Sequence, residues 1–296
     1  MARRDFVGYG REGFDPQWPG GKNLALQFVI NYEEGGENCV LDGDAASEHL
    51  LSDIVGATPY AGQRNVNMES LYEYGSRAGF WRLHRAFTER KIPVTGRAMV
   101  EAGWEVASHG YRWIDYQNVD EATEREHIRK TIEVHEKVIG KRPVGIYQGK
   151  PNATTRKLVV EEAGFLYDSD AYNDDLPYWN LDFGRPHLVI PYTLTNNDMK
   201  FVSFQGFNAG DQFFTYLKDA FDVLLAEGRA GQSKMMSVGL HCRVVGHPGR
   251  VAALLRFLDY VKSFSDVWIC KREEIARHWY KTHYPATVGG IGGAKL

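Results

Sequence analysis

Acidic and histidine side chains stand where apolar stretches of this chain end. Glu33 and Glu34 follow the apolar residues 24–30, and His241 follows residues 236–240. A carboxylate can accept a proton from water, and an imidazole can deliver a proton to a leaving atom. These residue types therefore indicate general acid–base chemistry, in a hydrolase or a lyase.

Five apolar segments end in this way. The polar stretches that follow them are residues 31–37, 107–110, 147–150, 167–170 and 240–243. In barrels and open α/β sheets, ligands bind at the carboxyl ends of the strands, so we expect the five stretches to surround one site. Taken singly, each also fits the polar start of a loop, and His109 or His241 alone also fits a hydrogen-bonded structural histidine. The recurrence at five ends favours the site.

Expected strands alternate with expected helices along nearly the whole chain. This order is typical of parallel βαβ units, in an open sheet or a barrel. The strands are expected at residues 24–30, 92–95, 104–108, 144–147, 165–168, 188–192, 236–240 and 267–270. The helices are expected at residues 68–91, 120–139, 154–163, 212–227, 248–264 and 273–283. Residues 1–22 are rich in glycine, proline and arginine and are expected to form an irregular arm.

The composition is that of an ordinary globular protein. Of the 296 residues, 43% are hydrophobic, and the formal net charge of −3 gives no electrostatic reason to expect nucleic acid or an anionic membrane as a partner. No run of about 18 apolar residues occurs, so no transmembrane helix is expected. Three cysteines at unrelated spacings, and a basic start that no apolar segment follows, favour a reducing cytoplasm.

Residues 31–35, Asn-Tyr-Glu-Glu-Gly, resemble the first acidic motif of the polysaccharide deacetylase family, and the resemblance extends over residues 8–284. It implies an α/β fold, the distorted (β/α)7 TIM-like barrel of the NodB homology type. The expected organisation is therefore the arm at residues 1–22 followed by one catalytic barrel domain at residues 23–296.

The resemblance also implies roles for individual residues. The general base of the family corresponds to Glu33, and one of its metal ligands corresponds to Glu34. The family's pair of histidine ligands corresponds to His109 and to Trp113, and an indole nitrogen donates hydrogen bonds but cannot bind a metal. Hydrolytic zinc usually has three protein ligands, so we expect no bound metal and no other cofactor.

The later motifs depart from the family in a consistent way. Gln148 stands where the family has an arginine, and His241 corresponds to its general acid. Together the motifs resemble the branch of metal-independent bacterial allantoinases, which open the hydantoin ring of allantoin. The resemblance implies that His109 assists the two catalytic groups Glu33 and His241. It also implies a substrate site formed by Glu34, Trp113, Gln148 and Tyr111, although Trp113 and Tyr111 also fit ordinary packing roles.

The expected function is therefore hydrolysis of a small ureide in purine degradation, by a cytoplasmic homo-oligomer, a tetramer in this branch. Two alternatives remain open. One is a zinc-dependent carbohydrate N-deacetylase, with a ligand from elsewhere in the chain in place of the second histidine. The other is a barrel that binds without catalysis. Residues 95–103 favour the latter, because they are too few for a full strand and helix and predict a shortened barrel.

Overall fold

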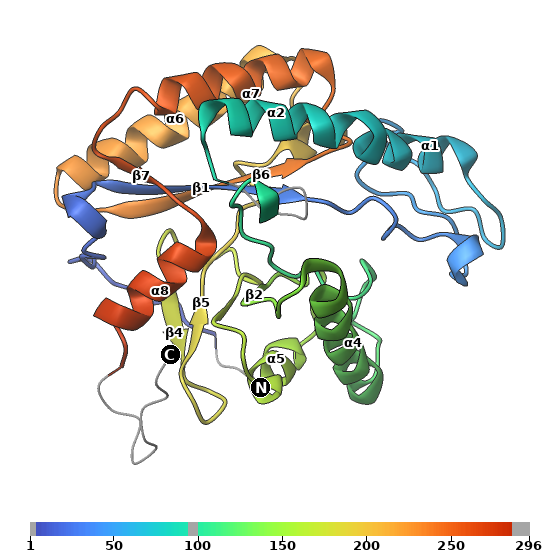
Figure 1. Cartoon of the computed structure of the whole chain (residues 1–296), viewed down its shortest axis with the longest axis horizontal. Helices are drawn as coiled ribbons and strands as arrows, with labels where there is room; N and C mark the ends of the chain where they lie inside the picture. Colours follow the sequence, from blue (N-terminus) through green and yellow to red (C-terminus); the bar gives the residue numbers. More distant parts are fainter. Residues whose placement is uncertain (1–3, 94–99, 286–296) are drawn as a thin grey trace.

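The computed structural model describes residues 4–93 and 100–285. Its strands form two sheets, with the strand orders β6-β1-β7 and β2-β3-β5-β4 (Figure 1). The strands are β1 (Leu24–Asn31), β2 (Gly145–Ile146), β3 (Tyr167–Asp168), β4 (Tyr178–Asn180), β5 (His187–Val189), β6 (Lys234–His241) and β7 (Val267–Ile269). The described pairs are parallel except β4 with β5. A parallel bridge between Asn197 and Gly239 links the chain beyond β5 to β6.

Helices follow most of the strands, as the alternation in the sequence predicts. They are α1 (Val66–Tyr74), α2 (Phe80–Arg90), α4 (Glu121–Ile139), α5 (Thr155–Glu162), α6 (Gly210–Arg229), α7 (Pro248–Val261) and α8 (Arg272–Thr282). A π-helical turn, η3 (Gly75–Gly79), joins α1 to α2. Figure 1 shows α2, α6 and α7 over one face of the β6-β1-β7 sheet.

The larger core lies between the β6-β1-β7 sheet and the helices that cover it. Every second residue of β1, from Leu24 to Ile30, packs into this core. Of the alternate residues of β1, Ala25, Gln27 and Asn31 are also buried, and Val29 is half-buried. A strand buried on both faces reads as a continuous apolar run, which explains why β1 is detectable in the sequence. Leu254 and Phe221 are among the side chains of the covering helices that are fully buried in this core.

The N-terminal arm is irregular apart from the short helix η1 (Pro19–Gly21). It is held by Trp18, whose ring centroid lies 5.6 Å from that of Trp279 in α8. The Trp18 indole also donates a hydrogen bond to the carbonyl of Lys234. Burial of this large side chain fastens the arm to the barrel.

One of the expected strands differs from the structure. Residues 104–108 form no strand but a single parallel bridge, from Ser108 to Ile146 in β2. The strand expected at 92–95 and the shortened stretch near 95–103 fall partly on residues 94–99, which lie outside the described residues. The antiparallel β4 was not expected, because its three half-buried residues carry too little apolar pattern.

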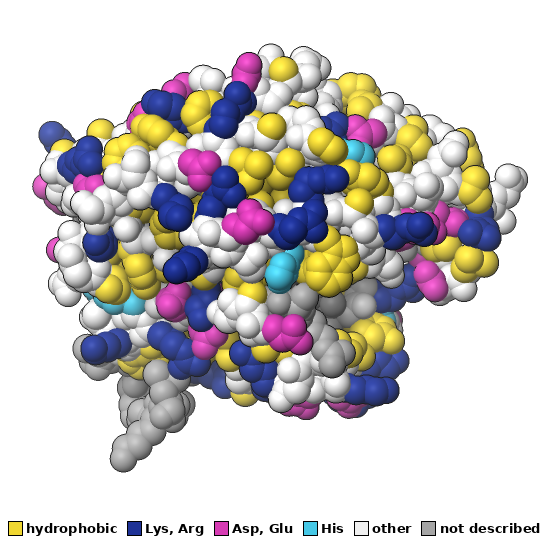
Figure 2. All heavy atoms as spheres, turned by 45° about the horizontal axis from the view of Figure 1, so that its top comes forward, with side chains coloured by type: hydrophobic (Ala, Val, Ile, Leu, Met, Phe, Trp, Pro, Cys, Tyr) yellow, Lys and Arg dark blue, Asp and Glu magenta, His cyan; other side chains and the backbone are white. Residues whose placement is uncertain are grey.

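Charged residues of both signs are mixed over the face shown in Figure 2, which agrees with the near-balanced composition. No helix in the described part of the chain is long and apolar enough to span a membrane.

We expect Leu254→Ala to lower the free energy of unfolding by about 2–5 kcal/mol, because it removes buried methyl groups and leaves a cavity. Val223→Ala is the matched control, since Val223 is 57% exposed on α6. Urea unfolding of both variants measures the difference. Equal losses for the two variants would show that the core does not lie where the structure places it.

Candidate active site

The parallel register of β1 and β6 brings two predicted catalytic residues together. Asn31, at the end of β1, is level with His241, at the end of β6. Side chains two residues apart in an extended chain point the same way, so Glu33 continues the row that begins at Asn31. His109 approaches from the segment that bridges to β2 at Ser108. Three segments far apart in the sequence thus meet at one place.

The carboxylate of Glu33 is the centre of this group. Its side chain is 3% exposed. Its Oε1 lies 3.2 Å from His109 Nε2 and 3.5 Å from His241 Nε2. Arg243 Nη2 donates to its Oε2 over 2.6 Å. Burial alone would raise the pKa of Glu33, but His241, Arg243 and His109 together hold that pKa well below the usual range.

Hydrogen-bond partners restrict the protonation of His109. Its Nδ1 lies 2.8 Å from the carbonyl oxygen of Tyr147, which only accepts, so Nδ1 carries a proton. Its Nε2 can then donate to the Glu33 carboxylate only when the ring is a cation. In the cationic form of His109, Nε2 is a hydrogen-bond donor beside the Glu33 carboxylate.

Asp198 fixes His241 in the same manner. Asp198 is fully buried in the short helix η4 (Asp198–Val202), and its Oδ1 lies 2.6 Å from His241 Nδ1. Its Oδ2 accepts from the backbone N–H groups of His241 and Val245. Burial opposes the charge on His241, yet Glu33 and Asp198 raise the pKa of this histidine to about 9. His241 therefore carries a proton that it can donate near neutral pH.

Sequence reasoning did not assign roles to Asp198 and Arg243. Arg243 is buried, with its guanidinium carbon 4.0 Å from the centre of the Tyr72 ring. Its Nη1 has no hydrogen-bond partner and lies 3.8 Å from Glu34 Oε1. The signal for Arg243 was its place two residues beyond His241. Asp198 had no such signal, since it lies beyond the end of β5, at the start of the short helix η4 that the sequence did not predict.

Glu34 contacts the backbone of both loops at the site. Its Oε2 accepts from the backbone N–H of Glu33 and its Oε1 from that of Arg243. Burial raises the pKa of Glu34 to about 7. These contacts join the loop after β1 to the loop after β6.

The π-helical turn η3 presses directly on these two loops. A Cβ on Gly75 would lie 2.0 Å from Glu34 Oε1, and one on Gly79 would lie 2.0 Å from the carbonyl oxygen of Cys242. Only glycine permits such an approach at either position. Turns of this kind occur often at functional sites, and here the turn supports both loops from behind.

Trp113 lies near the same loop, with its Cβ 3.7 Å from the position of a Cβ on Gly36. Its ring makes a cation–π contact, because Lys150 Nζ lies 3.5 Å from the ring centre. Glu48 and Glu33 are among the charges that act on Lys150, while burial lowers its pKa. Lys150 is thus a further cation near the site that sequence reasoning missed, although it belongs to the polar stretch 147–150.

The two remaining residues predicted to bind substrate, Gln148 and Tyr111, lie in different surroundings. Gln148 is 2% exposed beside Gly110, and its Oε1 has no hydrogen-bond partner. Tyr111 is 42% exposed and packs on His127 of α4. Gln148 therefore stays close to His109, whereas Tyr111 turns to the outer helix.

The residues present do not fit a three-ligand metal site. No group of three or more His, Cys, Asp or Glu side chains in the described residues has the arrangement that holds a metal ion. Glu33 is already held by Arg243, and a guanidinium so close to the carboxylates disfavours a second cation there by like-charge repulsion.

Known proteins resemble this chain over nearly its whole length. The sequence profile of the family described as polysaccharide deacetylase matches residues 64–166. A candidate polysaccharide deacetylase of Schizosaccharomyces pombe is 41% identical over 313 residues, which cover 95% of this chain and 98% of that protein. This aligned length exceeds the 296 residues of the chain, so the yeast protein has residues with no counterpart here.

Two solved structures are similar at equal identity. The crystal structure of Puue allantoinase is 56% identical, with a TM-score of 0.93, covering 96% of this chain and 99% of that chain. The crystal structure of a probable polysaccharide deacetylase from Pseudomonas aeruginosa PAO1 is also 56% identical, with a TM-score of 0.92, covering 95% of this chain and 98% of that chain. These similarities confirm the expected fold class.

We expect Asp198→Asn to destabilise the folded protein most at low pH. His241 has a pKa of about 9 when folded against an ordinary 6.5, so its protonation stabilises the fold fully below pH 6.5, and this stabilisation is lost as the pH rises through about 9. Asparagine has one side-chain oxygen, whereas Asp198 uses two oxygens as hydrogen-bond acceptors. The variant therefore stabilises the imidazolium of His241 less.

Urea unfolding of both proteins across this pH range measures the effect, and NMR titration of His241 gives its pKa. Asp219→Asn is the control, because Asp219 is exposed on α6. A difference in stability that does not narrow towards pH 9, or an unchanged pKa of His241 in Asp198→Asn, would contradict the assigned pairing.

Proposed function

The chain belongs to the polysaccharide deacetylase family, and from that premise we propose that it hydrolyses a cyclic amide C–N bond, opening the hydantoin ring of allantoin to give allantoate. The observation that carries the proposal is the Glu33 carboxylate, with Oε1 3.2 Å and 3.5 Å from the Nε2 atoms of His109 and His241. A proton acceptor, two proton donors and the fixed cation of Arg243 meet there.

In the first step, water attacks a ring carbonyl. Glu33 Oε1 accepts a proton from the water as the new C–O bond forms. The carbonyl oxygen becomes an oxyanion, and His109 in its cationic form would donate a hydrogen bond to it from Nε2. His241 and Arg243 hold the pKa of Glu33 well below its usual range, so the base is ionised at neutral pH.

In the second step, the C–N bond breaks. His241 transfers its Nε2 proton to the departing ring nitrogen, while Asp198 holds Nδ1 and orients the ring. The proton taken by Glu33 then returns to His241, 3.5 Å away. Water has been added across the C–N bond, and both side chains are restored.

The choice of a ureide rests on Gln148 and on similarity. Gln148 offers a buried amide oxygen without a partner next to the loop of His109, which suits an N–H group of the substrate. The structure named Puue allantoinase shares 56% of its residues with this chain. Of the other residues expected to bind substrate, Glu34 contacts the protein itself, because its Oε2 accepts a hydrogen bond from the backbone N–H of Glu33.

The equally similar probable polysaccharide deacetylase favours a second candidate, a metal-dependent N-deacetylase. That reaction requires a three-ligand metal site, and Trp113 occupies the place of the second histidine. We therefore place it second and let metal removal distinguish the two.

The purified protein is expected to hydrolyse allantoin and to retain that activity after exhaustive chelation, because the proposed charges all come from side chains. Colorimetric detection of allantoate measures the rate, and an acetylated chito-oligosaccharide tested in parallel is the control substrate. Loss of activity on chelation that Zn²⁺ or Co²⁺ restores would establish the metal-dependent reaction instead.

We expect Glu33→Gln to lower kcat by about 10²–10⁴-fold, because the amide keeps the shape and cannot accept the proton. Glu34→Gln is the matched control one residue away. It retains an acceptor for the backbone and resembles the protonated acid present below a pKa of about 7. Steady-state kinetics with allantoin compares the two. A larger loss in Glu34→Gln would reverse the assignment of the base.

A further inference from the structure

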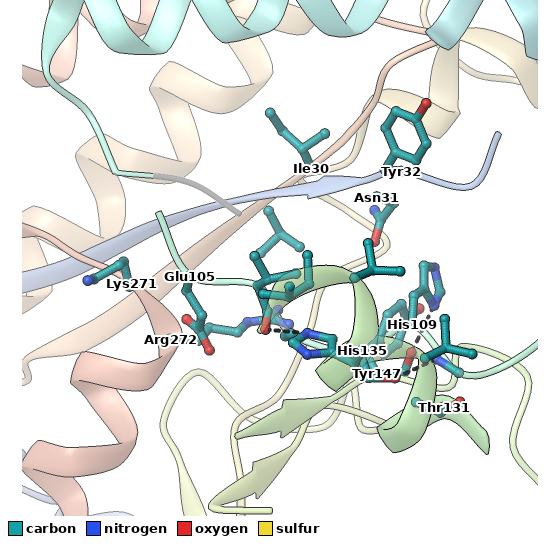
Figure 3. A pocket seen from close by; sticks show the side chains of 18 of the residues that line it. Ile30, Asn31, Tyr32, Glu105, His109, Thr131, His135, Tyr147, Lys271 and Arg272 are labelled. Atoms are coloured by element: carbon teal, nitrogen blue, oxygen red, sulfur yellow. Dashed lines mark hydrogen bonds between the residues drawn. The ribbon is translucent and has the colours of Figure 1, made fainter. Parts of the chain in front are cut away.

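The loop after β2 runs directly beside the candidate active site. It begins at Tyr147, whose carbonyl oxygen lies 2.8 Å from His109 Nδ1 (Figure 3). Two residues further on, Gly149 has a φ of +83°, and a Cβ there would lie 3.1 Å from His109 Cε1. The chain therefore turns against the ring of His109, and Lys150 is the next residue.

The backbone of this loop is held from two sides. The carboxylate of Asp170 accepts from the backbone N–H groups of Gln148 and Gly149 over 2.9 and 2.8 Å. The carbonyl oxygen of Lys150 accepts from the backbone N–H of Tyr116 over 3.1 Å. A side chain on a held backbone loses less conformational freedom when it binds a ligand. The backbone position of Lys150 is therefore set before a ligand binds.

The side chain of Lys150 lies over the indole ring of Trp113, with Nζ 3.5 Å from the ring centre. Trp113 in turn packs on the turn that carries Glu33. Its Cβ lies 3.7 Å from the position of a Cβ on Gly36, and the N–H of Gly36 donates to the carbonyl oxygen of Glu33 over 2.8 Å. Lys150 thus adjoins the Glu33 turn through Trp113, as its neighbour in the chain adjoins His109.

Carboxylates act on the charge of Lys150 from a distance. Burial lowers the pKa of Lys150, while Glu48, Glu33 and Asp115 oppose that shift. Among the described residues, no carboxylate oxygen lies within 4.0 Å of Nζ, and no acceptor forms a hydrogen bond with it. The other residues of the chain contain no aspartate or glutamate. The nearby anions therefore favour the ammonium form but leave its N–H groups unbonded.

A ligand can reach these N–H groups. Lys150 is half-buried, and its Nζ is not one of the fully enclosed polar atoms that lack a partner. An ammonium has three donors and no acceptor, and a hydrogen bond from a charged donor is stronger than one between neutral groups. Lys150 is therefore suited to bind a carbonyl oxygen of a molecule placed between Glu33 and the histidines.

We propose that Lys150 determines the specificity of this site, by donating a hydrogen bond to a second carbonyl oxygen of the substrate beside the carbonyl that water attacks. The inference rests on the proposed ring opening, in which His109 serves the attacked carbonyl. The hydantoin ring has a second carbonyl on its imide nitrogen, whereas a lactam or an N-acetyl group has one carbonyl only. Lys150 therefore favours ureide rings over simple amides.

Calorimetric titration with hydantoin and with butyrolactam, a ring of the same size with one carbonyl, tests the inference without requiring turnover. Any slow ring opening gives a steady heat that is separate from the heat of binding. The unmodified protein is expected to bind hydantoin roughly tenfold or more tightly than butyrolactam, because of the charge-assisted hydrogen bond.

Lys150→Met keeps the length of the side chain and loses the charge, so it is expected to lower this preference roughly tenfold. Lys150→Arg retains a charged donor and is expected to keep most of the preference. Lys137→Met, the same change at an exposed lysine of α4, is the control and leaves the preference unchanged. Lys150→Gln is a second neutral variant, in case Lys150→Met does not fold.

Steady-state kinetics with allantoin separate this inference from the proposed function. Lys150→Met is expected to raise KM roughly tenfold and to change kcat much less, since it removes a contact that the substrate keeps throughout the reaction. If the unmodified protein prefers hydantoin but does not turn over allantoin, the ring opening is refuted and the role of Lys150 stands.

The role of Lys150 is overturned if the unmodified protein has no preference for hydantoin. It is equally overturned if a folded neutral variant at this position keeps that preference, or keeps the KM of the unmodified protein. Loss of the preference in Lys150→Arg to the same extent as in Lys150→Met would show that the charge is not what the substrate requires.

Discussion

The charge of one buried carboxylate organises the whole candidate site. Glu33 is removed from water, and an ionised carboxylate in such a place requires cations and hydrogen-bond donors around it. Arg243, His241 and His109 supply them from two other segments of the chain. The cation on His241 in turn requires its own anion, which is Asp198. The site is therefore a chain of alternating charges, Asp198, His241, Glu33 and Arg243, in which the neighbouring charges raise the pKa of His241 and lower that of Glu33.

This chain of charges needs a rigid frame, because ion pairs weaken steeply with small displacements. The register between β1 and β6 fixes the first pair. The backbone contacts of Glu34 then tie together the two loops that carry Glu33 and Arg243. The π-helical turn η3 closes on both loops through Gly75 and Gly79, where any larger residue would collide. Secondary structure, loop and helix thus constrain the same few atoms.

The same arrangement explains how a barrel of this family can present positive charge without three metal ligands. A guanidinium at Arg243 stands 2.6 Å from Glu33 and 3.8 Å from Glu34. It is bound covalently to the chain and always charged, so it needs no ligand set of histidines. Trp113, in the place of the second histidine, carries Lys150 on its ring instead. Two fixed cations, Arg243 and Lys150, therefore lie near the carboxylate of Glu33.

The sequence by itself determined the alternation of strands and helices, and it placed Glu33, His109 and His241 at strand ends. It could do so because a buried strand reads as an apolar run and because the carboxyl ends of parallel strands share one edge. The observed bounds of β5 and α7 differ from the predicted bounds by a few residues, since the ends of helices and strands depend on capping and pairing. Residues 104–108 look like a strand in isolation, yet only Ser108 has a described strand partner.

Only the tertiary structure decided which polar residues serve the site. Asp198 has no local pattern that marks it, and the partners of Arg243 and Asp198 lie 210 and 43 residues away in the chain. Glu34 is adjacent to Glu33 in sequence, but the turn of the loop directs it to backbone groups instead of the histidines. Electrostatic pairing acts over a few ångströms in space whatever the separation along the chain. Residue types and strand ends are therefore readable from the sequence, whereas the partners of each charge are fixed only when the barrel folds.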